Sequence, residues 1–510
     1  MHSIYTQASN VAIWLGDLGW PGKYIKSVFK FFKEFATGLT AEGIVPSYAH
    51  LVDAWPDDLY IENIEEVDVE SLDGENAREI VGLTVGLRSF IRHCWFERTW
   101  TVQEFFLAQK SIFYCGGHTF DGGAFMQFMS HLTKHDRFCC AVDLPIKFQI
   151  YISNACSTME AFQHLKTFRS SLLECIGSFR HRKATDPRDK IYGLLGLGAS
   201  DTKDLIQPDY TLSVEQVYEN FVVSLLDRTK HLDVFSHVRT ERQPNFNLPS
   251  FVPDWTMDLS EIYWPEQRAW SKQWCLLDVY DACHGSKVDF KAQPGALSIR
   301  GKIIDVIRTV ATQDLGGSQR QRGVSTSDAI DEWLKIANVP PQEEDPGLAK
   351  RESFWVAMCA GIERNSNASP EDFNDFNEMQ PTQKYSDIFH RLSGIETDLH
   401  EGYEETLRKI PETKEAGAVV IPDPYRPINM SVGLAHRNRR VMGTRDGRVG
   451  LAPKHARQGD VVAVLTGGRV PFILRPEEHH YTIVGDAYVH GIMDGEALQA
   501  GEELEYIELH

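Results

Sequence analysis

The hydrophobic period of this chain changes at about Leu248, and this change limits the folds that the chain can adopt. Before Leu248, apolar side chains mostly recur at three- and four-residue steps, which is the spacing of helices. Toward the end of the chain, short apolar runs alternate with turn signals such as Asp446-Gly447 and Gly459-Asp460, which is typical of strands. The chain therefore combines a largely helical part with a later β-rich part.

The length of 510 residues is too great for a single hydrophobic core, and about three domains are expected. We predict an α+β multidomain protein with an α/β layer over residues 1–118 and a helical region over 119–245. A β-rich domain is predicted over 246–320 and 430–510, interrupted by a helical insertion over 321–429. Within it, strands are predicted around a glycine at 296–307 and at 440–443, 448–451, 461–465, 470–474 and 481–484.

The α/β layer is predicted from the order strand, helix, loop, helix, strand. Residues 9–15 form an apolar run that ends at Gly16-Asp17, as a strand buried on both faces does. Residues 80–104 are predicted to be one helical stretch and 111–115 a second strand. A strand buried in this way needs neighbours on both sides, and the eight residues before it supply no second strand.

Charge and cysteine usage exclude several classes of partner and site. The 52 basic and 72 acidic residues give a net charge of −20, which repels phosphate backbones and anionic lipid heads. We therefore expect no nucleic acid and no membrane as partner.

Nine cysteines without a C-x-x-C pair are typical of free thiols in a reducing compartment. Without a signal peptide or a membrane-length apolar run, the expected location is the cytoplasm.

Two sequence signals predict helix starts. Ser213 and Gln216 have the spacing of a capping box. In the segment Asp186-Pro187-Arg188-Asp189, Asp186 is a candidate cap, Pro187 suits the first helical position, and Asp189 favours the positive end of the helix dipole.

Four segments, in this order along the chain, resemble segments of fungal heterokaryon-incompatibility (HET) proteins. The first is Met1-x-x-Ile4-Tyr5-x-x-Ala8 with Val11-x-x-Trp14-Leu15-Gly16, and the second is Trp95-Phe96-x-Arg98-x-Trp100-x-x-Gln103-Glu104. The third is Asp186-Pro187-Arg188-Asp189-Lys190-Ile191-Tyr192-Gly193-Leu194-Leu195-Gly196. The fourth is Gly485-Asp486-Ala487-Tyr488-Val489-His490-Gly491-Ile492-Met493-Asp494-Gly495-Glu496, with Leu248-Pro249-Ser250-Phe251-Val252-Pro253-Asp254-Trp255 upstream of it. The chain is thereby identified as a member of this family. The resemblance implies that residues 1–118 are the C-terminal part of a HET domain.

The family's opening Ser-Tyr-x-Trp-Gly and Asp-x-x-Cys-Ile-Asn-Gln segments are not found in the sequence, and Met1 matches a methionine inside the family's domain. We therefore expect an N-terminally truncated HET domain with an incomplete sheet. The resemblance further implies a TIR-like, flavodoxin-like α/β fold. Some TIR enzymes cleave NAD with a glutamate on a helix that follows an aromatic-rich segment, and Glu104 matches that position. A carboxylate there stabilises an oxocarbenium ion, and Trp100 is expected to share its helix face.

The alternative role for this segment is structural. Three side chains have the i, i+4, i+7 spacing of a core-facing stripe: Phe96, Trp100 and Gln103. Glu104 would then pair with Arg98 or Arg88, or cap backbone groups. Trp95 and Trp100 are candidates either for core packing or for an interface.

The remaining candidate residues favour structure over chemistry. Asp186, Arg188 and Asp189, followed by Tyr192, are expected to form a helix cap and an Arg–acid network. No metal site is expected, since the spacing of His479, His480 and His490 is not that of a zinc site.

The function implied by the resemblance is non-self recognition, in which the HET domain is an effector of programmed cell death through self-association or partner binding. Other proteins of the incompatibility system are the implied partners. The alternatives are an NAD-cleaving hydrolase that uses Glu104, and a degenerate family member without activity. No cofactor is expected, and NAD would be a substrate only.

Overall fold

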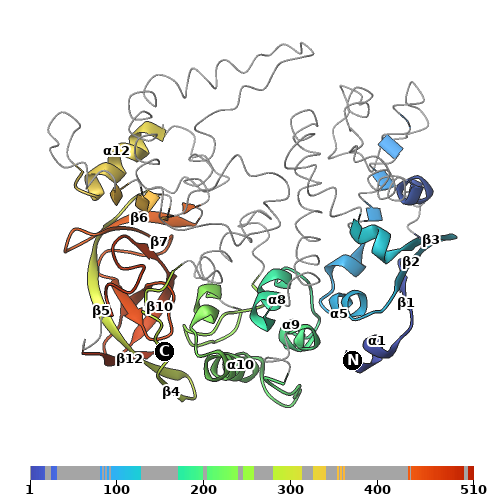
Figure 1. The fold of residues 1–510 in the computed structure, drawn as a ribbon, viewed down its shortest axis with the longest axis horizontal. Helices are drawn as coiled ribbons and strands as arrows, with labels where there is room; N and C mark the ends of the chain where they lie inside the picture. Colours follow the sequence, from blue (N-terminus) through green and yellow to red (C-terminus); the bar gives the residue numbers. More distant parts are fainter. Residues whose placement is uncertain are drawn as a thin grey trace, which may run out of the picture. The chain divides into compact units, whose positions relative to one another are not determined.

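Two sheets, each in its own unit of the chain, organise the computed structural model (Figure 1). The first unit comprises residues 1–211 and 255–268, and the second comprises 212–254 and 269–510. The structure describes residues 2–17, 24–30, 78, 81–82, 85–86, 89–90, 93–127, 171–198, 204–238, 245–257, 280–312, 326–339, 353–354, 356–358, 360–361, 435–436, 438–498 and 503–510. The predicted mixture of helices and sheets is confirmed, whereas the TIR-like fold and the domain boundaries stay predictions.

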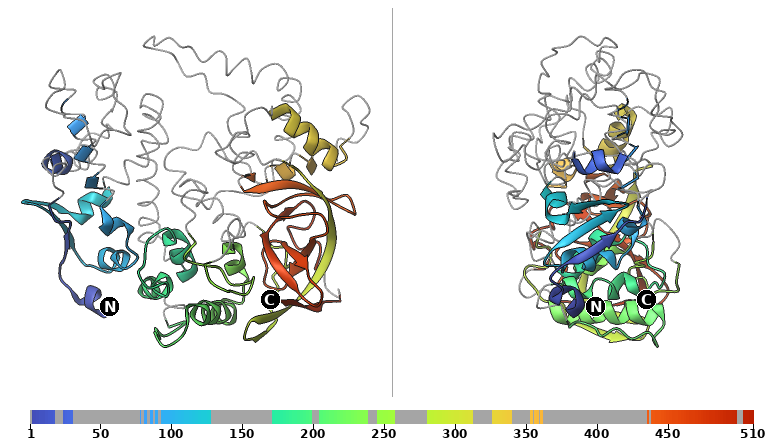
Figure 2. Two further views of the ribbon diagram at one scale, coloured as in Figure 1. Left: turned by 180° about the vertical axis from the view of Figure 1, so that it is seen from behind. Right: turned by 90° about the vertical axis from the view of Figure 1, so that its right-hand side faces the viewer.

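The sheet of the first unit has the order β1 (Val11–Trp14), β2 (Ser111–Cys115) and β3 (His118–Asp121). Strand β1 is parallel to β2, and β2 is antiparallel to β3. The views in Figure 2 show β1 at the outer edge of this sheet. The strands at 9–15 and 111–115 are thus confirmed in position.

The two faces of this sheet differ. Ile13 and Phe113 are buried, whereas Trp14 on the opposite face of β1 is 65% exposed. The prediction that the first strand is buried on both faces is therefore wrong. Side chains alternate between the faces of a strand, and here only one face packs against the core.

Residues 94–106 do not form the continuous helix predicted up to residue 104. A 3-10 helix, η4 (Cys94–Glu97), precedes an extended residue, Arg98, and α5 (Thr101–Phe106) begins three residues later. The break is stabilised by the buried guanidinium of Arg182, which donates to the Arg98 carbonyl and the Thr101 hydroxyl. Most of residues 80–92 lie outside the described residues.

Several other segments of the first unit are helical. They include α1 (His2–Gln7), α8 (Leu172–Phe179), α9 (Asp189–Tyr192) and the 3-10 helix η5 (Leu195–Leu197). Helix α8 begins at a capping box formed by Ser171 and Glu174. At its other end, the buried Nζ of Lys190 donates to the carbonyls of Arg180 and Arg182, so that α9 is tied to the end of α8.

The second unit starts with helix α10 (Val214–Thr229) and the 3-10 helix η6 (Asp233–His237). The predicted capping box is confirmed, since Ser213 Oγ accepts the N–H of Gln216 and Gln216 accepts the N–H of Ser213. The helix ends at Lys230, which adopts the left-handed conformation with φ of 61°.

A sheet of nine strands forms the centre of the second unit. The strands are β4 (Phe290–Gln293), β5 (Ala296–Val310), β6 (Arg439–Thr444), β7 (Val449–Pro453), β8 (Val461–Leu465), β9 (Phe472–Pro476), β10 (Tyr481–Asp486), β11 (Tyr488–Val489) and β12 (Glu505–Leu509). All five runs predicted between residues 440 and 484 are confirmed as strands. The glycine in 296–307 does not separate two strands, however, because β5 runs through Gly301 without a break.

Strand β5 closes the sheet into a barrel. Its residues 297–301 pair with β12 and its residues 301–306 pair with β8. Since β12 pairs with β10, β10 with β9, and β9 with β8, these five strands close on themselves. Gly301 lies where two strands approach, and an added Cβ would be 2.7 Å from the Val464 carbonyl oxygen.

The barrel core is filled with small and branched apolar side chains, among them Ala452, Val462, Val464 and Ile473. Helix α12 (Thr326–Ile336) packs against the barrel near β6. Most of the predicted insertion over 321–429 lies outside the described residues. Among the helices that the structure describes, none has the length and apolar character that a bilayer span requires.

Candidate functional site

The first candidate site is the tryptophan segment, residues 95–104, which the sequence singled out. Trp95 is buried in an aromatic cluster, with its ring centroid 5.5 Å from that of Phe113 and 5.0 Å from that of Phe96. Its indole Nε1 donates to Glu104 Oε2 at 3.1 Å. The carboxylate of Glu104 therefore satisfies a donor that the cluster would otherwise leave buried without an acceptor.

A second group reaches the same carboxylate from helix α1. Burial raises the pKa of the Tyr5 hydroxyl, and the negative charge of Glu104 and a hydrogen bond to it raise it further, whereas Arg98 lowers it. Glu104 itself is partly exposed. Tyr5, Trp95, Arg98 and Glu104 thus form one polar cluster, which we call the carboxylate corner.

Trp100 and Gln103 contact a different part of the chain. Trp100 Nε1 donates to Asp189 Oδ2 at 2.9 Å, and Gln103 Nε2 donates to the Gly193 carbonyl oxygen at 2.7 Å. Trp100 and Glu104 keep the predicted four-residue helical spacing, since the Trp100 carbonyl accepts the Glu104 N–H, but their side chains do not share a partner. The helix starts only at Thr101, and the two side chains bond to partners on separate elements.

Close approach explains why a glycine follows Tyr192. A Cβ added at Gly193 would lie 2.7 Å from the Asp189 carbonyl oxygen and 3.0 Å from a methyl carbon of Thr99. A larger residue would push α9 away from the tryptophan segment. The Gln103 and Trp100 bonds would then both lengthen.

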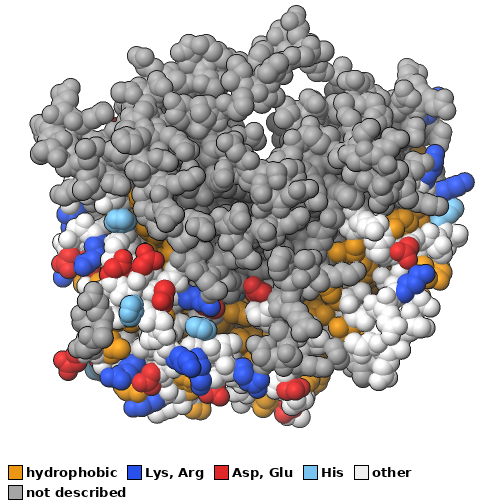
Figure 3. Space-filling model, viewed as in Figure 1, with side chains coloured by type: hydrophobic (Ala, Val, Ile, Leu, Met, Phe, Trp, Pro, Cys, Tyr) orange, Lys and Arg blue, Asp and Glu red, His pale blue; other side chains and the backbone are white. Residues whose placement is uncertain are grey.

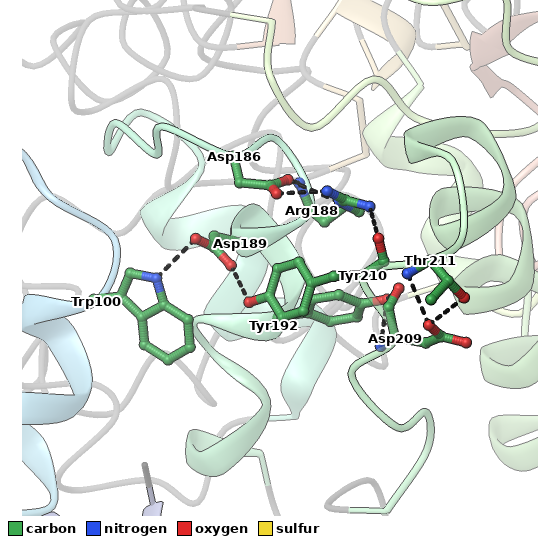
Figure 4. A network of polar contacts seen from close by, with 8 residues as sticks. All are labelled: Trp100, Asp186, Arg188, Asp189, Tyr192, Asp209, Tyr210 and Thr211. Atoms are coloured by element: carbon green, nitrogen blue, oxygen red, sulfur yellow. Dashed lines mark hydrogen bonds and ion pairs between the residues drawn. The ribbon is translucent and has the colours of Figure 1, made fainter.

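The segment from Asp186 to Gly193, called the DPRD segment below, forms the other half of the site (Figure 4). Arg188 donates to both carboxylate oxygens of Asp186, at 2.9 and 2.7 Å, and to the carbonyl oxygen of Tyr210 at 2.7 Å. Its guanidinium holds the pKa of the Asp186 carboxyl below its usual value. The predicted Arg–acid network is confirmed for this pair. The predicted helix start at Pro187 is wrong, because α9 begins at Asp189 with Arg188 as its N-cap, and Asp186 accepts the N–H of Arg188 in the turn before the helix.

Asp189 connects both halves of the site. One carboxylate oxygen accepts from Trp100, and the other accepts the Tyr210 hydroxyl at 2.7 Å (Figure 4). Burial raises the pKa of Tyr210, and so does its hydrogen bond to Asp189. Asp189 is thus a bridge between residues 100 and 210, which nothing in the sequence pattern connects.

The Tyr192 hydroxyl holds the neighbouring backbone. It donates to the Asp209 carbonyl oxygen at 3.1 Å and accepts the Asp209 N–H at 3.2 Å. The Asp209 carboxylate accepts both the N–H and the hydroxyl of Thr211. These bonds fix the last residues of the first unit's longer segment, 1–211. Sequence reasoning missed Asp209 and Tyr210, and the only local signal is the turn-forming Pro208-Asp209 pair.

The other predicted site residues lie elsewhere. Trp14 is exposed on β1, and Gly16 ends that strand with a left-handed φ of 71°, its carbonyl accepting the N–H of Gly116. His480 lies against His510, with ring centroids 4.4 Å apart. In the part of the chain that the structure describes, no group of three or more His, Cys, Asp and Glu side chains could hold a metal ion.

Comparisons with known proteins agree with the sequence resemblance. The model of a family described as "Het-6 beta-barrel domain" matches residues 420–507, which include most strands of the barrel. The chain is 24% identical to heterokaryon incompatibility protein 6, OR allele, of Neurospora crassa, over 99% of this chain and 79% of that protein. No solved structure gives a match.

Proposed function

Because the chain belongs to the fungal heterokaryon-incompatibility (HET) family, we propose that it acts in non-self recognition as an effector of cell death. It does so through self-association or through binding other proteins of the incompatibility system, in the cytoplasm. The name of the similar Neurospora crassa protein, heterokaryon incompatibility protein 6, supports this role. The interaction role is preferred over catalysis because of how the tryptophan segment is bonded.

The observation that carries this proposal is that the polar groups of the tryptophan segment bond to the protein itself. Trp95 bonds to Glu104, Trp100 to Asp189, and Gln103 to Gly193. Residues used in this way set the geometry of a framework and present the surfaces around it. Substitutions in the framework should therefore act by disturbing those surfaces.

The test is expression in a filamentous fungal host from an inducible promoter. Wild-type protein should stop colony growth and admit a vital dye into most hyphal compartments. Trp100→Phe, which lacks the N–H that Asp189 accepts, should reduce the stained fraction about tenfold at equal protein abundance. Tyr506→Phe, on the exposed surface of the barrel, is the matched control and should behave as wild type. Unchanged growth with wild-type protein would remove the effector role.

A second candidate function is cleavage of NAD, and the carboxylate corner is the observation that favours it. Glu104 is partly exposed and is oriented by Trp95, with Tyr5 and Arg98 close by. A fixed carboxylate of this kind can stabilise an oxocarbenium ion on the ribose of a bound nucleotide.

Nicotinamide release by the purified chain tests this second function. Glu104→Gln keeps an acceptor for the Trp95 N–H but removes the charge, so catalysis by the carboxylate predicts a loss of at least about 100-fold. Trp95→Phe removes the orienting bond and keeps the charge, and it should be less damaging. If wild-type protein releases no nicotinamide, NAD cleavage is excluded. If it also leaves fungal growth unchanged, the chain is a degenerate family member.

A further inference from the structure

We propose that two copies of this chain associate through the outer edge of β1, with Ala12 of each copy pairing with Trp14 of the other. The inference rests on the proposed function, because it names the surface through which the proposed self-association takes place. It is drawn from the backbone of β1, its side chains and its lack of charge.

The backbone of β1 is bonded on one side only. Val11 N–H donates to the Lys110 carbonyl and Leu15 N–H to the Tyr114 carbonyl. In a parallel pair, alternate residues of a strand bond to the same neighbour, so the N–H and C=O groups of Ala12 and Trp14 point away from β2. Within the described part of the chain, β1 pairs with β2 alone.

The side chains at this edge are apolar and exposed. Trp14 is 65% exposed, and Ala12, on the same face, is exposed too. Ile112 and Tyr114 of β2 continue this face and are half-buried. A large exposed indole at an open strand edge is typical of a surface that pairs with another strand.

The edge of β1 is a part of the surface where charge does not oppose the approach of a second copy. The chain carries a net charge of −20, so most of its surface repels another copy. Residues 3–16, however, contain no Asp, Glu, Lys or Arg. Figure 3 shows few charged side chains on the surface around α1, at the lower right. Natural edge strands that must stay unpaired carry lysine or proline, and β1 has neither.

An antiparallel pair of β1 strands about a two-fold axis satisfies all four outward groups of each strand. With the axis at Ile13, Ala12 of one copy exchanges two backbone hydrogen bonds with Trp14 of its partner, and the reverse pair makes two more. Each indole then lies beside a small alanine on the same face, where there is room for it. The two three-stranded sheets become one sheet of six strands.

The contact is small, because each strand offers only four residues. A contact of this size gives a weak, reversible dimer. Its formation therefore depends on protein concentration, and a rise in local concentration is enough to drive it. Self-association of this kind suits a signalling protein that must be inactive when dilute.

The test measures association of the full purified chain by sedimentation velocity over a concentration series. Ala12→Pro removes the outward N–H and leaves the bonds to β2 intact, because those use Val11, Ile13 and Leu15. It should raise the dissociation constant at least about tenfold. Trp14→Lys places a charge at the edge and should have the same effect. Ala12→Ser and Trp14→Phe keep the backbone groups and an uncharged edge, and both should dimerise as wild type does.

Amide hydrogen exchange completes the test. In the wild type, the Ala12 and Trp14 amides should become protected as concentration rises, whereas the amides of Ile13 and Leu15 should be protected throughout and in Ala12→Pro as well. A chain that stays monomeric overturns the inference, as does a dimer that survives both edge variants. Slow exchange of Ala12 and Trp14 in a monomer would mean that another segment of the same chain occupies the edge, and would also overturn it.

These outcomes are independent of the fungal growth assay. Dimers that depend on β1, together with unchanged growth, would refute the effector role and keep the pairing. Cell death caused by a chain that is monomeric in solution would refute the pairing and favour binding to another protein.

Discussion

In the first unit, the tryptophan segment and the DPRD segment meet in a region that we call the junction. The junction and the barrel of the second unit are stabilised by different kinds of contact. In the junction, distant parts of the chain are joined by individual hydrogen bonds, some between side chains, such as Trp100 to Asp189 across 89 residues, and two between the backbones of residues 97–99 and Lys183. In the barrel, distant segments are joined by backbone ladders along β5, with an apolar core inside. The barrel therefore tolerates the loss of most single polar groups, whereas the junction depends on a few.

Buried charged side chains also have different kinds of partner in the two regions. In the barrel, Arg439 is paired with Asp486, and Asp305 and Asp460 likewise accept from arginines. In the junction, Arg182 and Lys190 donate to neutral carbonyl and hydroxyl oxygens. A buried pair is destabilised severely when one partner is removed, because the other charge stays buried. Substitution of one partner in these ion pairs should therefore destabilise the barrel more than the loss of its other single polar groups.

The largest effect is expected for Arg439→Met. Arg439 and Asp486 have side chains only 11% and 4% exposed, so the variant removes the positive charge of a buried ion pair and leaves the carboxylate buried. The free energy of unfolding of the second unit should fall by about 3–5 kcal/mol, measured by urea denaturation with amide exchange of β6 and β10. Arg457→Met is the matched control, because the Arg457 side chain is 67% exposed, and it should cost less than about 1 kcal/mol. Equal losses in the two variants would contradict the comparison.

A pH-dependent loss of stability is expected in the second unit from one buried histidine. His436 is fully buried and stacked on Trp333 with centroids 4.4 Å apart, and burial lowers its pKa to about 3 from 6.5. The unfolded chain therefore binds the proton first as pH falls. Stability from this residue is complete above pH 6.5 and is lost toward pH 3, at about 1.4 kcal/mol per pH unit.

Urea denaturation at several pH values between 7.5 and 4 measures this slope. His436→Phe keeps the stacking but cannot bind a proton. The slope of its free energy of unfolding against pH should therefore be smaller by about 1.4 kcal/mol per pH unit. His455→Gln, at an exposed position, is the control and should keep the wild-type slope. Equal slopes in wild type and His436→Phe would contradict the prediction, because they would show that the His436 ring binds a proton equally well in the folded and the unfolded chain.

Sequence reasoning located the barrel strands better than the junction. The runs from 440 to 484 are separated by glycines such as Gly447 and Gly459, which have positive φ in the structure, and such turns have a local signature. Strand β12 was not predicted, because its residues are mostly charged or exposed and it is held by ladder bonds to β5. Local patterns cannot show a pairing of this kind.

At the candidate site, the sequence identified the residues but not their partners. Trp100 and Asp189 were both singled out, yet their hydrogen bond depends on the tertiary fold. The extended residue Arg98 was missed because its cause, the buried guanidinium of Arg182, lies 84 residues away. Asp209 and Tyr210 were missed entirely, since neither belongs to a periodic pattern.

A medium effect is expected in the junction for Trp100→Phe. The variant removes the N–H that Asp189 accepts, and a hydrogen bond to a charged group contributes about 1.5–3 kcal/mol when buried. Since Trp100 is only half-buried, the first unit should lose about 1 kcal/mol. Trp14→Phe is the matched control, because Trp14 is exposed and its change should stay within about 0.5 kcal/mol in the monomer. A similar loss in both variants would mean that ring size matters and the bond to Asp189 does not.

The smallest effect is expected for Tyr210→Phe, and it tests whether Asp189 couples the two halves of the junction. Tyr210 is 49% exposed, so solvent competes for its hydroxyl, and the loss should be about 0.5 kcal/mol. Both Tyr210 and Trp100 donate to Asp189, however, and each bond helps to fix the carboxylate for the other. The double variant Trp100→Phe/Tyr210→Phe should therefore cost less than the sum of the single variants, by up to about 0.5 kcal/mol. The cycle is measured by urea denaturation, with amide exchange of α5 and residues 209–211 as the local readout. Strict additivity would show that Asp189 holds Trp100 and Tyr210 independently, and the junction would then be two separate contacts.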